Sequence, residues 1–194
     1  MRGLGRFGLC AMVIPTLMSA CARPTVIYNH SVYTRYSPVE FGVAAGRKDL
    51  RTVIYGDPFG MGHERFAEAT VAALNRHDPP PQPTTFTLEP GESANPNYRA
   101  VLVFDDPDVP TIRLCQEPPP RGSQGATTDG TLHVAAAFCL NRGELTAVKG
   151  KVADVQTVDD RKFDDLLGQV VIALFPPSDP NQDDDGNVLL IGRR

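Results

Sequence analysis

The chain has 194 residues, a formal net charge of −4 at pH 7 and a sequence pI of about 5.5. An acidic chain without a basic cluster lacks the electrostatic footprint of a nucleic-acid-binding protein, so we expect no nucleic-acid partner. Hydrophobic residues make up 41% of the chain, which is enough for a core, whereas the absence of tryptophan and an aromatic content of 7% disfavour a site that stacks sugars.

The first twenty residues have the composition of a secretory signal. Arg2 and Arg6 lie in a start without acidic residues, and an uncharged stretch follows from residue 7 to residue 20. A basic start, an apolar centre and a small-residue cleavage region are the parts of such a signal. The uncharged stretch is shorter than the roughly 20 residues that span a bilayer, which disfavours a permanent membrane helix.

The end of this stretch resembles the lipobox of bacterial lipoproteins, in which an apolar residue and two small residues precede a cysteine. Here the four residues are Met18, Ser19, Ala20 and Cys21. The resemblance covers residues 1–21 and implies that residues 1–20 are removed as a signal peptide, while Cys21 receives a thioether-linked diacylglycerol and an acyl chain such as palmitate. It also implies a lipid-anchored, periplasm-facing protein of the bacterial cell envelope. Ala22, in place of an aspartate, favours the outer membrane over the inner membrane.

Two other interpretations of the N-terminal segment remain open at this stage. One is an ordinary cleaved signal peptide, and the other is a cytoplasmic chain with an apolar N-terminus. The lipoprotein interpretation predicts that residues 21–38 are a lipidated tether and that residues 39–194 form a single domain.

Within that domain, hydrophobic periodicity predicts both strands and helices. Alternating or continuous apolar runs bounded by turn residues predict strands at 40–46, 51–56, 84–88, 98–104, 111–115, 131–140 and 144–155. Apolar residues at helical spacing predict helices at 63–77 and 160–175, which are followed by Pro79 and Pro176. We therefore expect an α+β fold with a mainly antiparallel sheet of six or seven strands and two helices packed on one face.

The cysteines predict a disulfide bond. If Cys10 leaves with the signal and Cys21 carries lipid, Cys115 and Cys139 remain as a pair, which an oxidising compartment would oxidise. In the predicted strands both residues point away from the core face. Two separate, half-buried thiols are the alternative.

The glycine-rich segment from residue 55 to residue 64 is the best candidate for a ligand loop. Its candidate residues are Gly56, Asp57, Gly60, Gly62 and His63. A strand, a glycine-rich turn and a helix start can bind phosphate through backbone N–H groups. The segment lacks the P-loop and dinucleotide signatures, however, and a purely structural turn is the other interpretation.

The chain shows no catalytic constellation and no clear metal site. The histidines share no metal-ligand spacing, so we expect no zinc and no cofactor. The acidic segment 181–188 matches part of a calcium loop through Asn181, Asp183 and Asp185, but Gly192 stands where the bidentate glutamate belongs.

These observations predict a membrane-anchored cell-envelope lipoprotein that is not an enzyme. Its small domain would have a binding or an assembly and support role, with the membrane and an unidentified envelope protein as partners. A ligand-binding or transport-auxiliary lipoprotein is one alternative. An envelope enzyme whose site residues are scattered along the sequence is another.

Overall fold

The computed structural model describes residues 25–116 and 130–178. The two longest strands of its sheet, β5 (Thr131–Leu140) and β6 (Gly143–Ala153), form an antiparallel hairpin. The other four strands are β1 (Val26–Val32), β2 (Asp49–Tyr55), β3 (Thr85–Thr87) and β4 (Tyr98–Phe104). The strand order is β1-β6-β5-β4-β2-β3. The strong strand predictions at 98–104 and 131–140 are confirmed.

The sheet is mixed, although most of its pairs are antiparallel. Strands β1, β6, β5 and β4 pair antiparallel with their neighbours, whereas β2 runs parallel to both β3 and β4. The parallel pair β2 and β3 is joined through a helix, as parallel neighbours require. The expected α+β class is thus confirmed, with a mixed sheet of six strands.

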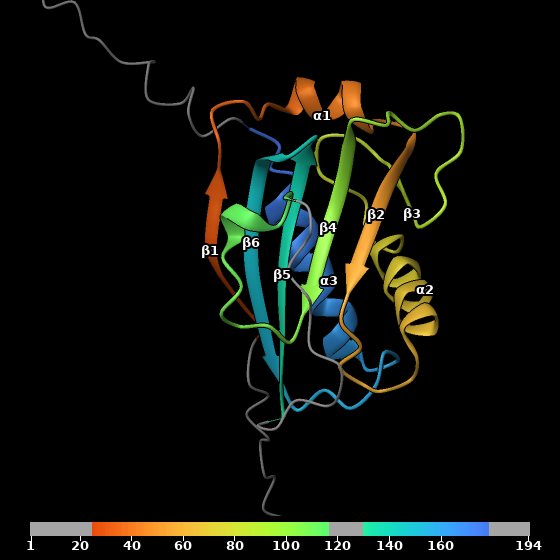
Figure 1. Cartoon of the computed structure of the whole chain (residues 1–194), viewed down its shortest axis with the longest axis vertical. Helices are drawn as coiled ribbons and strands as arrows, with labels where there is room; N and C mark the ends of the chain where they lie inside the picture. Colours follow the sequence, from red (N-terminus) through yellow and green to blue (C-terminus); the bar gives the residue numbers. More distant parts are fainter. Residues whose placement is uncertain (1–24, 117–129, 179–194) are drawn as a thin grey trace, which may run out of the picture.

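The strand register defines two ends of the sheet. At the lower end in Figure 1, β1 begins and β2 and β4 finish. The register agrees with this arrangement. Val26 and His133 both pair with Lys151, and Phe104 pairs with Val134, the residue next to His133. At the upper end, β1 finishes and β4 begins.

Helices α2 (His63–Leu74) and α3 (Arg161–Leu174) cover one face of the sheet, as expected (Figure 1). Their apolar residues and the facing strand residues form the main core, which includes Phe66, Phe104 and Phe163. Close contact of α3 with the sheet depends on Gly150, since a Cβ there would lie 2.8 Å from Leu166 Cδ1.

A third helix, α1 (Pro38–Ala44), lies across the upper end of the sheet, where the sequence predicted a strand at 40–46 (Figure 1). That strand prediction is wrong. Ser37 caps the helix by accepting a hydrogen bond from the Glu40 backbone N–H at 3.0 Å, and Pro38 occupies the first turn. Both are established helix-start features, and they outweigh the apolar residues that follow.

The predicted strand at 111–115 is also wrong, because these residues form a short 3₁₀ helix, η1 (Thr111–Arg113), followed by a turn. Segment 105–116 crosses the face of the sheet opposite α2 and α3 and packs as a second, smaller core (Figure 1). Ala135, Ala137 and Ala147 line the sheet beneath it, and their small side chains leave room for Val109 and Leu114.

Strand β1 falls inside the segment that the sequence assigned to the tether. Residues 26–32 pair with β6 and form one edge of the sheet, so the ordered domain begins earlier than residue 39. Asn29, in a left-handed conformation with φ of 49°, accompanies a register shift between Tyr28 and Ser31. Such an irregularity limits how far another strand can pair along this edge.

The C-terminal end of α2 meets the first turns of α3 through a small charged cluster. The Arg76 Nε and the His77 Nε2 lie 2.7 Å and 3.3 Å from the Asp164 Oδ1. Burial raises the pKa of Asp164, but the Arg76 hydrogen bond and charge and the nearby His77 outweigh it and lower the pKa below its usual value. The carboxylate therefore remains ionised at neutral pH and links the two helices.

Gly168 provides a test of how closely these helices pack. In an exposed helix interior, changing glycine to alanine stabilises by up to about 1 kcal/mol. Here a Cβ would lie 2.8 Å from the His77 Cε1, so we expect Gly168→Ala to destabilise by about 1 kcal/mol. In a His77→Ala background the same change should stabilise by about 0.5–1 kcal/mol. Urea denaturation of the four proteins measures both effects, and equal effects in the two backgrounds would contradict this packing.

Candidate functional site

The candidate ligand loop joins β2 to α2 at the lower end of the sheet, and the structure brings its five predicted residues together. Gly56, Gly60 and Gly62 all have positive φ values, of 94°, 63° and 99°, which favour glycine. Asp57 is buried, with 6% of its surface exposed, whereas His63 is exposed at the first position of α2.

Within the loop, Asp57 binds the backbone groups that a phosphate would need. Its Oδ2 accepts a hydrogen bond from the Gly62 N–H at 2.7 Å, and its Oδ1 accepts one from the Met61 N–H at 3.2 Å. The Asp57 carbonyl accepts a third bond from Gly60 N–H at 3.2 Å. An anionic ligand that used the Met61 and Gly62 groups would have to displace this carboxylate. The geometry is that of an aspartate-capped turn.

Replacing Asp57 tests this role. We expect Asp57→Ala to lower the free energy of unfolding by about 1–3 kcal/mol, because it leaves two backbone N–H groups without their acceptors. Asp57→Asn keeps one carbonyl oxygen and should lose about half as much. Chemical denaturation measures both changes. A stability unaffected by the alanine variant would show that solvent replaces the carboxylate without cost.

The predicted disulfide between Cys115 and Cys139 is present, and both residues are fully buried. Cys139 lies on β5 and faces away from the main core, as expected. Cys115 comes from the turn after η1 instead of a strand, and its Cα lies 5.6 Å from that of Cys139. The bond therefore fixes segment 105–116 onto the sheet.

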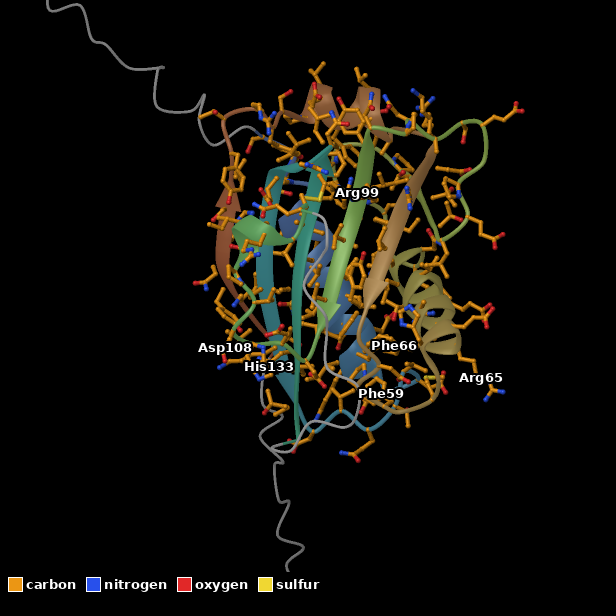
Figure 2. The ribbon with its side chains drawn as sticks, viewed as in Figure 1. Phe59, Arg65, Phe66, Arg99, Asp108 and His133 are labelled. Carbon is orange, nitrogen blue, oxygen red and sulfur yellow. A yellow bond between two sulfur atoms is a disulfide. The ribbon has the colours of Figure 1, made fainter. Side chains whose placement is uncertain are left out.

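Two charged side chains hold the backbone of Cys115 on either side of the disulfide. The Arg99 Nη2 donates to the Cys115 carbonyl at 2.8 Å, and the Cys115 N–H donates to the Glu144 Oε1 at 3.1 Å. Arg99 and Glu144 both pair with Cys139 across β4, β5 and β6. Figure 2 shows Arg99 toward the upper end of the sheet. Strands β4, β5 and β6 thus each contribute one contact to the turn at Cys115. The sequence did not indicate this arrangement.

Helix α1 is joined to the sheet by a hydrogen bond from the Tyr98 hydroxyl to the Glu40 carboxylate. Burial of Tyr98, together with this bond and the charge of Glu40, raises the pKa of Tyr98 from 10.0 to about 12. This contact was not predicted, because the apolar pattern around residue 40 favours a strand, whereas Glu40 lies in α1. The Ser-Pro-x-Glu start of α1 was the signal that could have revealed it.

The raised pKa of Tyr98 predicts a pH dependence of stability. Between about pH 10 and pH 12 the unfolded chain loses the Tyr98 proton while the folded protein retains it, so stability falls as the pH rises. We expect the stability advantage of the wild type over Tyr98→Phe to shrink by about 2 kcal/mol over this range. Denaturation curves at several pH values measure it. A constant difference between the two proteins would contradict the prediction.

Several other predictions concern metals and membranes. Among residues 25–116 and 130–178, no group of three or more His, Cys, Asp or Glu side chains is placed to hold a metal ion. The same residues include no helix of sufficient length and hydropathy to cross a membrane. Cys21 and the calcium candidates Asn181, Asp183 and Asp185 lie outside the described residues.

Comparisons with known proteins add little to this picture. No protein-family model matches the chain, and no curated protein matches it either. A solved structure that it resembles is a dodecameric variant of PelC from Paraburkholderia phytofirmans, with 9% identity and a TM-score of 0.41 over 78% of this chain and 98% of that one. A likeness at this level does not bear on the function of this chain.

Proposed function

We propose that this protein is a lipoprotein of the bacterial cell envelope whose small α+β domain has a non-enzymatic binding or assembly role at the membrane. The observation that carries the proposal is the run Met18, Ser19, Ala20 and Cys21, which follows a basic start and an uncharged stretch. Cys21 would be the lipidated first residue of the mature chain.

The start of the folded domain is compatible with a membrane anchor at Cys21. Strand β1 begins at Val26, five residues later. A fully extended chain spans at most about 3.6 Å per residue, so this connection reaches no more than roughly 18 Å. The lower end of the sheet, where β1 begins, would therefore face the membrane surface at close range. The upper end, with α1, would point away from it (Figure 1).

The disulfide supports an oxidising location for the domain. Buried disulfides persist in the periplasm and in secreted proteins, and they are rare in the cytoplasm. The bond between Cys115 and Cys139 is thus consistent with export across the inner membrane. Ala22, in place of aspartate, favours the outer membrane as the site of attachment.

Metabolic labelling tests the anchor. When the full chain is expressed in a bacterium with radiolabelled palmitate, we expect the wild type to be labelled and to sediment with membranes. Cys21→Ser should lose both properties. Cys10→Ser is the matched control, because Cys10 lies within the predicted signal peptide, and it should be labelled like the wild type.

Two results would overturn the proposal. The first is the absence of palmitate from the wild type. The second is a Cys21→Ser variant whose mature form and membrane attachment equal those of the wild type. Fractionation of inner and outer membranes on a density gradient then tests the expected location in the outer membrane.

A further inference from the structure

An open apolar groove lies at the upper end of the molecule, beside α1. Val39 and Val43 point outward from one side of the helix and are 76% and 56% exposed. With prolines from two other segments they border a groove of about 550 Å³, which is lined by Pro38, Val39, Gly42, Val43, Pro80, Pro81, Gln82 and Pro177. Exposed apolar residues that gather in one patch, and are not scattered singly, indicate a site of interaction.

The groove is preformed in the folded domain. The Gln82 side chain lies against Gly42 of α1 and against Gly46 just after it, and a Cβ at Gly42 would be only 2.9 Å from the Gln82 Nε2. The Arg47 N–H donates to the Pro83 carbonyl at 2.7 Å, which holds the proline loop against α1. Docking of a segment here would therefore not cost additional free energy to order the groove.

Positive charge borders the same surface. Arg47 and Lys48 lie three and four residues after the end of α1 and are exposed. The Lys48 Nζ donates to the carbonyl of Val43 at 3.1 Å, so its charge is held beside the groove. An occupant that combines apolar residues with acidic residues would match both properties, because opposite charges at the rim guide a segment into place.

The chain itself continues from the groove into a segment of this chemistry. Pro177 lines the groove, and the sequence after Ser178 has three aspartates at 183–185 and four apolar residues, Val188, Leu189, Leu190 and Ile191. Between these groups, Asp185 and Gly186 form a dipeptide typical of tight turns. The ten residues that lead from Ser178 to Val188 span up to about 35 Å when extended, which is enough chain for residues 188–191 to fold back onto the groove.

We propose that residues 188–191 of the same chain occupy the groove beside Val39 and Val43, with the aspartates at 183–185 next to Arg47 and Lys48. The proposal does not depend on lipidation of Cys21. It assigns the acidic residues Asp183 and Asp185 an electrostatic partner within the protein.

Thiol accessibility tests the proposal in the full-length protein. Val43→Cys and Ile172→Cys form a matched pair, because Val43 and Ile172 are 56% and 58% exposed in the described domain and Ile172 lies on α3, outside the groove. We expect a maleimide reagent to modify position 43 at least about tenfold more slowly than position 172. Mass spectrometry of the modified peptides separates these sites from the native cysteines.

Two further variants connect the protection to the proposed occupant. Replacing Val188, Leu189, Leu190 and Ile191 with serine should raise the rate at position 43 to that at position 172. A variant with Val43→Cys and Leu190→Cys should form a disulfide within one chain on mild oxidation. Equal rates at positions 43 and 172 in the otherwise native chain, protection that survives the serine replacements, or a crosslink formed only between two chains would each overturn the proposal.

Discussion

Replacing Cys115 and Cys139 together with alanine is expected to lower the free energy of unfolding by about 3–4 kcal/mol. The two residues are separated by 24 positions. In the chain-entropy model, a crosslink that closes a loop of this size restricts the unfolded chain by that amount. Alanine is preferred to serine because both sites are fully buried and a hydroxyl there would need a partner.

Urea denaturation with and without reductant measures the effect of the disulfide. The wild type in reductant should unfold at the same urea concentration as the double alanine variant, and reductant should not change the variant further. A loss below about 1 kcal/mol would show that the hydrogen bonds of Arg99 and Glu144 to Cys115 hold segment 105–116 without the covalent bond. Hydrogen exchange of residues 109–116 would then remain protected in the variant.

The disulfide also shows what sequence reasoning can establish about a contact. The pairing followed from the small number of remaining cysteines and from the outward direction of Cys139, and it is confirmed. The path of the chain around Cys115 was predicted wrongly, because Ile112 and Leu114 alternate as in a strand. Ile112 is in fact 60% exposed and Leu114 is buried, since the 3₁₀ turn places only one of them against the sheet.

Short elements were the least predictable part of the fold. Helix α1 has seven residues, about two turns, which is too short to show a helical period in its apolar residues. Its capping residues, Ser37 and Glu40, carried the information instead. Strand β1 has exposed and half-buried residues along its length and no clear alternation. Its place in the sheet depends on pairing with β6, which is far away in the sequence.

The candidate loop illustrates a different kind of ambiguity. Its glycines are required by the backbone, as their positive φ values show, and that requirement is the same for a phosphate loop and for a structural turn. The difference lies in the direction of one carboxylate. The sequence shows an aspartate at position 57 but does not show that its oxygens point to the N–H groups of Met61 and Gly62.

Replacing Phe66 with alanine is expected to lower the free energy of unfolding by about 3–5 kcal/mol, the usual cost of removing a fully buried aromatic ring. Phe66 lies on α2, and its ring centroid is 4.8 Å from that of Phe104 on β4 and 6.2 Å from that of Phe163 on α3. The ring therefore joins both helices to the sheet. Its removal leaves a cavity at the meeting point of three elements.

Phe59 provides the matched control for this prediction, because its ring belongs to the same cluster but is only half-buried. Its centroid is 6.0 Å from that of Phe66, and the two residues lie near each other at the lower end of the molecule in Figure 2. We expect Phe59→Ala to cost about 1–2 kcal/mol, since solvent already reaches part of the ring. Calorimetry or urea denaturation compares the two variants.

If Phe66→Ala does not fold, Phe66→Leu keeps the prediction testable, because leucine retains much of the buried volume. We expect that variant to fold and to lose about 1–1.5 kcal/mol. A loss for Phe66→Ala no greater than that for Phe59→Ala would mean that the cavity closes when the ring is removed. The contacts between α2, α3 and β4 would then be more adaptable than their aromatic packing indicates.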